Sequence, residues 1–337
     1  MVRRVRARQD EALGARIVGR LTMRYASAGL ARDDSPDYIR AASGLTWVGD
    51  RLAVIQDDAN FLALVDPETG LADAIPLSAG PDGIRYFDDA RGNKARKMDL
   101  EAVTLVPSTD GVLLAAFGSG SLAPRETVVL VSFGRTAPPG VISHAASAFY
   151  ARLRGAAGFA GSEMNVEGAV YVDSAVKLFG RGNGAAVGEL QPTNASCDIT
   201  WTDLRAHLEH PSTISPPTPR DIVQYELGSL DGVSLGFTDV TRGAGESILY
   251  AAAAESSPDV TRDGDVHGSV LGVIQPGASM ARSTVLRDEQ GHRFRGKIEG
   301  IARDKVFDDR VFAVVDSDDH TRPAELLEVV LSGHWWD

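Results

Sequence analysis

The sequence has only one cysteine, Cys197, which excludes an internal disulfide framework. No apolar run approaches the roughly 18 residues of a membrane-spanning helix, and no signal-peptide pattern follows the basic start. Positive charge is in the minority, because 34 lysines and arginines stand against 46 aspartates and glutamates. Since nucleic-acid binding depends on neutralising phosphates, we expect no nucleic-acid partner. We expect a cytoplasmic protein with no membrane partner, present as a monomer or weak oligomer.

One pattern is repeated five times along the chain: a polar residue, an apolar strand, a turn and a second, more apolar strand. The polar residues that mark the repeats, here called the anchor residues, are Ser43, Glu101, Glu167, Thr238 and Glu299. Successive anchors are 58, 66, 71 and 61 residues apart, which leaves room for four short strands in each repeat. Short strands in a radial repeat are typical of a β-propeller. We therefore predict an all-β fold, a five-bladed β-propeller.

The two ends of the chain are expected to meet. Only 38 residues follow Glu299, which is less than one repeat. The N-terminal run 16–25 is predicted to form a strand that joins the C-terminal blade, closes the ring and removes an exposed sheet edge. A six-bladed propeller, with a degenerate blade within residues 1–42, is the alternative. Residues 1–15 are predicted to be a flexible basic tail, and residues 16–337 a single domain.

The anchor residues are expected to converge, because the first strand of each propeller blade lines the central channel. Three anchors are glutamates, and neighbouring carboxylates repel one another in a low dielectric, so either one is protonated or a cation lies among them. The set contains only oxygen ligands, which favours Ca²⁺ over Zn²⁺. The alternative is that the anchors only cap strand starts and bind water in the channel.

Short motifs around the anchors resemble those of the calcium-activated nucleotidases, the five-bladed apyrase family. The similar pieces are Ser43-Gly-Leu-Thr-Trp, Val54-Ile-Gln-Asp-Asp, Leu100-Glu-Ala, Glu167-Gly, Gly236-Phe-Thr and Lys297-Ile-Glu-Gly-Ile. Thr238 stands where that family has a serine. The resemblance implies a propeller whose anchors hold a central Ca²⁺ and which hydrolyses nucleotides. The Glu-Gly-Ile element is also similar to the esterase-like phytase propellers.

Polar residues end the second strands of the repeats, so we expect them to gather around one mouth of the channel. Asp57 or Asp58 is the candidate general base, and Arg181 is the candidate that stabilises developing negative charge. The candidate substrate-binding residues are Arg125, Asn183, Glu255, Asp316 and Asp318. Because surface turns are normally polar, the alternative is that most of these residues only form turns.

These features predict a Ca²⁺-dependent hydrolase that acts on an anionic small molecule, a phosphoester or a phosphoanhydride, at the mouth of the channel. Two alternatives stay open, because a fold does not fix a function. One is a non-catalytic propeller with a structural Ca²⁺ that binds a sugar, a peptide or a protein. The other is an ester or lactone hydrolase in which Ca²⁺ activates water.

Overall fold

The computed structural model describes residues 2–26, 36–80, 83–109, 111–134, 138–256, 264–316, 319 and 321–337. Within these ranges the fold is all-β with a few short helices, and no helix is long and apolar enough to cross a membrane. The helical segments are α1 (Ser147–Arg154), α2 (Ala157–Ala160), α3 (Trp201–Glu209) and the 3-10 turns η3 (Lys94–Arg96) and η4 (Ala123–Arg125).

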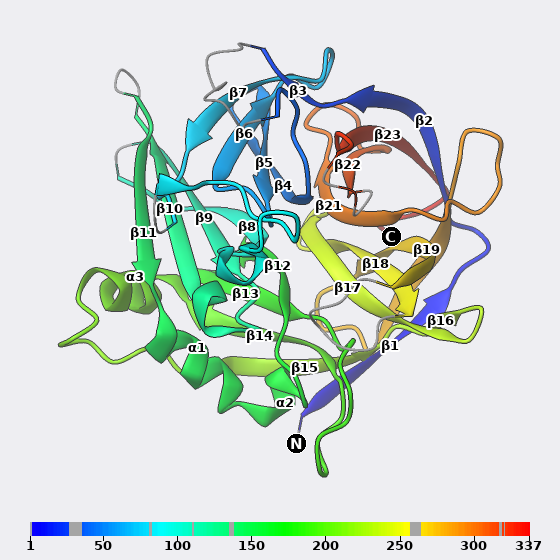
Figure 1. Ribbon diagram of the computed structural model, residues 1–337. Coiled ribbons are helices and arrows are strands. Elements are labelled where there is room, and N and C mark those ends of the chain that lie inside the picture. Colours follow the sequence, from blue (N-terminus) through cyan, green and yellow to red (C-terminus); the bar gives the residue numbers. More distant parts are fainter. Residues whose placement is uncertain are drawn as a thin grey trace.

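Most strands belong to five antiparallel groups of four strands, here called units 1 to 5 (Figure 1). Unit 1 consists of β4 (Ala42–Val48), β5 (Arg51–Gln56), β6 (Phe61–Val65) and β7 (Leu71–Pro76). Unit 2 consists of β8 (Leu100–Val106), β9 (Val112–Gly118), β10 (Thr127–Phe133) and β11 (Gly140–Ala145). Unit 3 consists of β12 (Val166–Val172), β13 (Ala175–Gly180), β14 (Asn194–Thr200) and β15 (Arg220–Glu226).

The last two units complete the repeat. Unit 4 consists of β17 (Val233–Arg242), β18 (Ile248–Ser256), β19 (Asp265–Ile274) and β20 (Met280–Arg287). Unit 5 consists of β21 (Lys297–Arg303), β22 (Arg310–Asp316), β23 (Glu325–Ser332) and the N-terminal β2 (Gly14–Thr22). The two-residue strands β3 (Arg24–Tyr25) and β16 (Ser229–Leu230) pair with β7 and β17.

The first strands of the units follow one another around a common axis. Strands β4, β8, β12, β17 and β21 contact their successive neighbours, and β21 in turn contacts β4. Each pair of neighbouring units encloses a cluster of buried apolar side chains, and the three helices cover the cluster between units 2 and 3. The arrangement is propeller-like, and Figure 1 looks along its axis.

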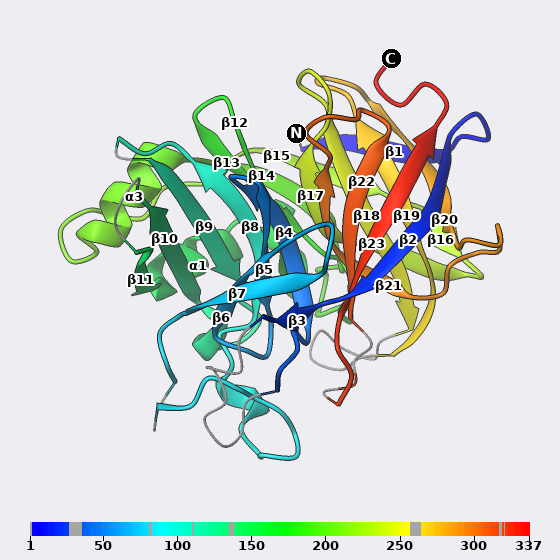
Figure 2. The ribbon, with the colours of Figure 1, turned by 90° about the horizontal axis from the view of Figure 1, so that it is seen from above.

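The strands near the N-terminus pair with four of the five units, and β3 contributes the pairing with unit 1. Strand β2 runs antiparallel to β23, as the sequence predicts for the run 16–25, and Figure 2 shows the two strands side by side. Strand β1 (Arg3–Gln9) runs parallel to both β15 and β20 and so connects units 3 and 4. Within the described part of residues 1–42, the strands therefore add to existing units and form no separate four-stranded sheet.

The prediction that residues 1–15 are a flexible tail is wrong, because β1 and the start of β2 lie within this segment. The arginines of β1 alternate with smaller apolar residues, and alternate residues of a strand face opposite sides. Val5 is fully buried in the cluster between units 3 and 4, whereas Arg4, Arg6 and Arg8 lie at the surface. The cluster of arginines made the segment resemble a charged tail, although its residues alternate as in a short strand.

Substitution of Val5 by alanine should lower the free energy of unfolding by about 1–2 kcal/mol, because each buried methyl-sized group contributes about 0.8 kcal/mol. The matched control is Arg8→Ala on the same strand, which should change it by less than about 0.5 kcal/mol. Urea denaturation of both variants measures the difference. Equal stability of the two variants would show that β1 does not pack on the core.

Candidate functional site

Each of the five anchor residues lies at a β-bulge in the first strand of its unit. In every unit the pairing with the second strand shifts by one residue at the anchor, between the residues on either side of it. A bulge leaves one residue outside the ladder and redirects its side chain. The five repeats of the sequence are therefore aligned in register, and the anchors are structurally equivalent.

Small residues after the bulges let the first strands approach closely. Gly44 follows the anchor of unit 1 and Gly300 that of unit 5, and a Cβ on Gly300 would lie 3.0 Å from the Cα of Gly44. A Cβ on Gly168 would similarly lie 3.1 Å from the backbone nitrogen of Val240 in unit 4. The glycines of the repeated Glu-Gly pattern are thus required by contact between backbones around the axis.

Four of the five anchors line one narrow cavity of about 60 Å³ at the axis: Ser43, Glu101, Glu167 and Glu299. The Ser43 hydroxyl donates to the carbonyl oxygen of Leu100 at 2.5 Å. Thr238 is fully buried but does not line this cavity, and its Oγ1 has no hydrogen-bond partner among the described residues. Four of the anchors therefore converge, as the repeat predicts, and Thr238 lies outside the cavity that they line.

Cationic side chains neutralise two of the three anchor glutamates. Lys297 Nζ lies 2.6 Å from Glu299 Oε1 and 3.3 Å from Glu255 Oε2. Arg181 lies 2.7 Å from Glu255 and 3.5 Å from Glu167. Burial disfavours the ionised form of Glu255, but Lys297 and Arg181 outweigh it and lower the pKa of Glu255 to about 2. For Glu299 burial prevails and raises the pKa to about 8, although Lys297 and Arg181 act in the opposite direction.

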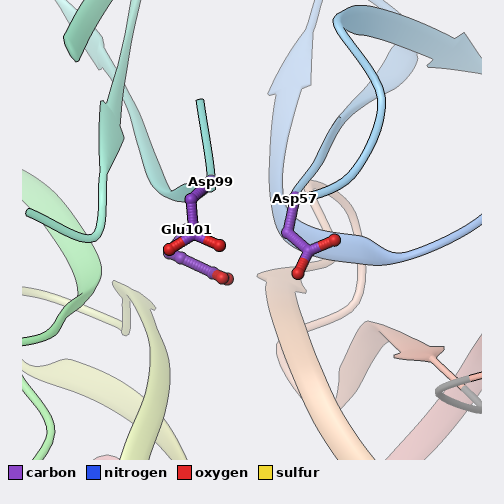
Figure 3. A group of neighbouring side chains, drawn as sticks. All are labelled: Asp57, Asp99 and Glu101. Atoms are coloured by element: carbon purple, nitrogen blue, oxygen red, sulfur yellow. The ribbon is translucent and has the colours of Figure 1, made fainter. Parts of the chain in front are cut away.

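A group of three carboxylates lies on the side of the cavity formed by units 1 and 2. Oxygens of Asp57, Asp99 and Glu101 all lie within 4.8 Å of one another, and Figure 3 shows Asp57 facing the other two across a gap. Lys97 forms ion pairs with Asp57 and, at 2.6 Å, with Asp99, while Arg125 lies 2.9 Å from Asp99. This acidic group could hold a metal ion.

The two carboxyl groups of unit 2 in this group differ in pKa. Burial disfavours the ionised form of Asp99, but Lys97 and Arg125 prevail and lower the pKa of Asp99. Burial and the charges of Asp99 and Glu167 raise the pKa of Glu101 well above its usual range. Glu101 has no hydrogen-bond or ion-pair partner among the residues that the structure describes.

The predicted rim residues mostly line the same cavity. Asp57, Arg125, Arg181, Asn183, Glu255 and Asp316 all belong to its lining. Asp58 lines an adjoining cavity with Asp57 and Asp316, and Asp318 lies outside the described residues. Asp58 lies 2.7 Å from Arg40, but burial and the Asp57 charge raise the pKa of Asp58 to about 7.

Sequence reasoning missed Lys97, Asp99 and Lys297. A signal for two of them was present, because Asp99 and Lys297 stand two residues before the anchors Glu101 and Glu299, and alternate strand residues share a face. Asn165 holds the same position in unit 3 and donates to Glu167 Oε1 at 2.6 Å. In unit 4 this position is Gly236, where a Cβ would lie 2.7 Å from Arg181 Cγ. Arg181 therefore occupies the space that a side chain would fill in the fourth unit.

The comparisons with known proteins place the chain in a family. A model described as "Family of unknown function (DUF6929)" matches residues 38–331. The chain belongs to this family. The matching family is thus not that of the calcium-activated nucleotidases, which the motifs resemble. A search of curated proteins found no match.

Solved structures show distant likeness over most of the chain. Glutaminyl cyclase from Myxococcus xanthus is 12% identical with a TM-score of 0.49, covering 98% of this chain and 99% of that one. The PQQ domain of pyranose dehydrogenase from Coprinopsis cinerea is 12% identical with a TM-score of 0.33, covering 97% and 100%. A putative exported protein from Bacteroides fragilis is 7% identical with a TM-score of 0.37, covering 98% and 99%. These similarities assign no activity to this chain.

Stability should fall as the pH rises from about 5 to 8. The pKa of Glu299 is raised from its usual 4.5 to about 8, so the folded protein binds more protons than the unfolded chain in this interval, and Asp58 acts in the same direction up to about pH 7. Glu299→Gln should make this fall smaller in urea denaturation at pH 5, 6, 7 and 8.

The matched control is Glu289→Gln at the surface. The hydrogen bond from Arg20 lowers the pKa of Glu289, so this carboxylate changes stability only below its usual pKa. Its replacement should leave the fall between pH 5 and 8 unchanged. An equal slope in the wild type and in Glu299→Gln would contradict the assignment of a raised pKa to Glu299.

Proposed function

We propose that units 1 to 5 are the blades of a five-bladed β-propeller closed by β2, and that the protein is a hydrolase acting on an anionic small molecule. The observation that carries the proposal is the combination of charges in one cavity. Arg125, Arg181 and Lys297 can attract an anion, and beside them lie carboxyl groups whose raised pKa suits proton transfer.

A hard divalent cation fits the donors that are present. The cavity is lined by seven carboxylates and five cationic side chains, which leaves a formal excess of two negative charges. The Thr238 hydroxyl has no hydrogen-bond partner among the described residues, and Glu101 forms no ion pair with them. Because Ca²⁺ prefers carboxylate and other oxygen ligands, we propose that Asp57, Asp99 and Glu101 hold it. Lys97 already contacts the two aspartates, so Glu101 has the greatest capacity to bind an added ion.

This assignment differs from a ring formed by all five anchors. Ser43 donates to a carbonyl group, while Glu167 and Glu299 have cationic partners. When bound, Ca²⁺ would polarise an oxygen of the substrate and lower the pKa of water. Asp57 then becomes a ligand, and the role of general base passes to Asp58.

The chain's own residues account for binding and proton transfer. Arg125 and Arg181 orient the phosphate group of a phosphoester or phosphoanhydride and stabilise its negative charge. Asp58, with a pKa of about 7, takes a proton from the attacking water. A bond forms between the water oxygen and phosphorus, the bond from phosphorus to the leaving oxygen breaks, and Glu299 donates a proton to that oxygen. The products are phosphate and an alcohol or a shorter phosphate.

The test is turnover of a panel of phosphoesters and phosphoanhydrides with Ca²⁺ or with a chelator. Arg181→Ala should lower kcat/KM by about 100-fold or more, the effect of losing one stabilising donor in a transition state. Glu101→Gln should raise the Ca²⁺ concentration needed for half-maximal activity. The matched control Arg205→Ala, at a surface position on α3, should leave turnover unchanged.

Three results would contradict the proposal. Activity that is the same in Arg181→Ala and Arg205→Ala would remove Arg181 from the site. Absence of turnover across the panel in the presence of Ca²⁺ would favour the non-catalytic binding protein. An activity confined to carboxylic esters or lactones would instead favour the alternative of an ester or lactone hydrolase.

A further inference from the structure

A second and larger space, here called the groove, lies against units 3 and 4. It adjoins the narrow cavity at the axis, which is called the tunnel from here on. This groove has a volume of about 670 Å³, within the range of about 300–1,000 Å³ that is usual for small-molecule sites. It is lined by the loop after β13, by β15, by the start of β17 and by Arg4 of β1. Arg181, Asn183 and Glu255 line both the groove and the tunnel cavity, so the two spaces meet at these three residues.

Arg181 presents an unused donor at this junction. Its Nη1 and Nη2 atoms are directed to Glu167 and Glu255, but its Nε has no hydrogen-bond partner among the described residues. Nε is buried against Gly236, a residue that lines the groove, because a Cβ on Gly236 would be 3.0 Å from it. Only 4% of Arg181 is exposed, and a polar group buried to this degree normally has a partner.

Asn183 presents an unused acceptor at the same junction. Its side-chain Oδ1 is buried and also lacks a partner among the described residues. A ligand that satisfies both Arg181 Nε and Asn183 Oδ1 must accept one hydrogen bond and donate another. A hydroxyl group does both. The groove offers further polar side chains for hydroxyl groups at Gln191, Thr193 and Ser234.

The charged residues of the groove are Arg4, Arg181, Glu226 and Glu255, so its formal charges balance. Glu226 pairs with Arg6, and Glu255 pairs with Arg181 and Lys297, which leaves the charge of Arg4 to attract an anionic ligand. Arg4 is exposed at the groove and forms no ion pair within the described part of the chain. We propose that the groove binds the sugar of a sugar phosphate and directs its phosphate to Arg181, an inference that rests on the hydrolase proposed above. The hydroxyl groups lie in the groove, and the scissile phosphate lies at the tunnel opening.

Equilibrium binding by calorimetry tests the proposal with glucose 6-phosphate, ribose 5-phosphate, glucose and inorganic phosphate as probes. At least one of the two sugar phosphates should bind ten or more times more tightly than inorganic phosphate or glucose. Asn183→Ala should weaken binding of that sugar phosphate fivefold or more and change binding of inorganic phosphate less than twofold. Arg4→Ala should weaken it more than the matched control Arg8→Ala, which removes the same charge from the same strand.

The failures of the groove and of the hydrolase are distinguishable. The proposal that the groove binds the sugar is contradicted if neither sugar phosphate binds more tightly than inorganic phosphate. It is also contradicted if Arg4→Ala and Arg8→Ala bind the sugar phosphate with the same affinity. Tight binding of a sugar phosphate that is never hydrolysed supports the proposed sugar site in the groove and contradicts the proposed hydrolase activity. Hydrolysis of phosphoesters with a KM that Arg4→Ala and Asn183→Ala leave unchanged supports the hydrolase and overturns the groove.

Discussion

The carboxylates around the tunnel repel one another, and the whole arrangement depends on how that repulsion is balanced. Five bulged strands direct their anchor residues toward one axis, and the close approach of Gly44 and Gly300 leaves little space between the strands. Lys97, Arg181 and Lys297 supply the opposing charges from within the protein. They lower the pKa of Glu255 and Asp99, whereas burial keeps the pKa of Glu299 raised in spite of Lys297. Glu101 is the one anchor glutamate without an ion pair in the described chain.

The sequence carried enough information to locate the anchor residues and the equivalent strands, and the structure adds that each anchor lies at a bulge. The polar residue before each apolar strand recurs because each unit places one side chain at the axis, and all five anchors lie at equivalent irregularities of pairing. The pairing of the run 16–25 with the last unit also followed from the sequence, because the final repeat lacks one strand. Periodicity and repeat length thus determined the strands and their order.

Other features depend on contacts between distant units, which no local pattern reveals. The role of Gly236 becomes visible only when Arg181 of the neighbouring unit is seen across it. Likewise, Lys97 precedes β8 without belonging to a repeated strand, so its ion pairs with Asp57 and Asp99 could not be read from spacing. In β1, the many arginines indicated an exposed tail, so the alternation of exposed and buried residues around Val5 was not recognised. The ion pairs of Arg181 with Glu167 and of Lys297 with Glu299 were not foreseen either, so the sequence alone predicted a ring of five Ca²⁺ ligands.

Arg181 lies where the axial cavity meets the groove, and it lines both spaces. Its guanidinium group pairs with Glu167 and Glu255, and its buried Nε has no hydrogen-bond partner among the described residues. The same residue therefore balances buried charge and forms part of the wall of the groove. The residue after Arg181 must be small, because a Cβ on Gly182 would lie 2.6 Å from the backbone nitrogen of Asn194.

A double-mutant cycle on Arg181 and Glu255 tests most directly whether internal cations balance the tunnel carboxylates. Arg181→Met alone should lower the free energy of unfolding by about 3–5 kcal/mol, because it leaves buried carboxylates without their partner. Combining it with Glu255→Gln should restore a substantial part of that loss, measured by urea denaturation at pH 7. If the two substitutions instead lower stability additively, or if Arg181→Met has no effect, the carboxylates are not held by this ion pair and the account fails.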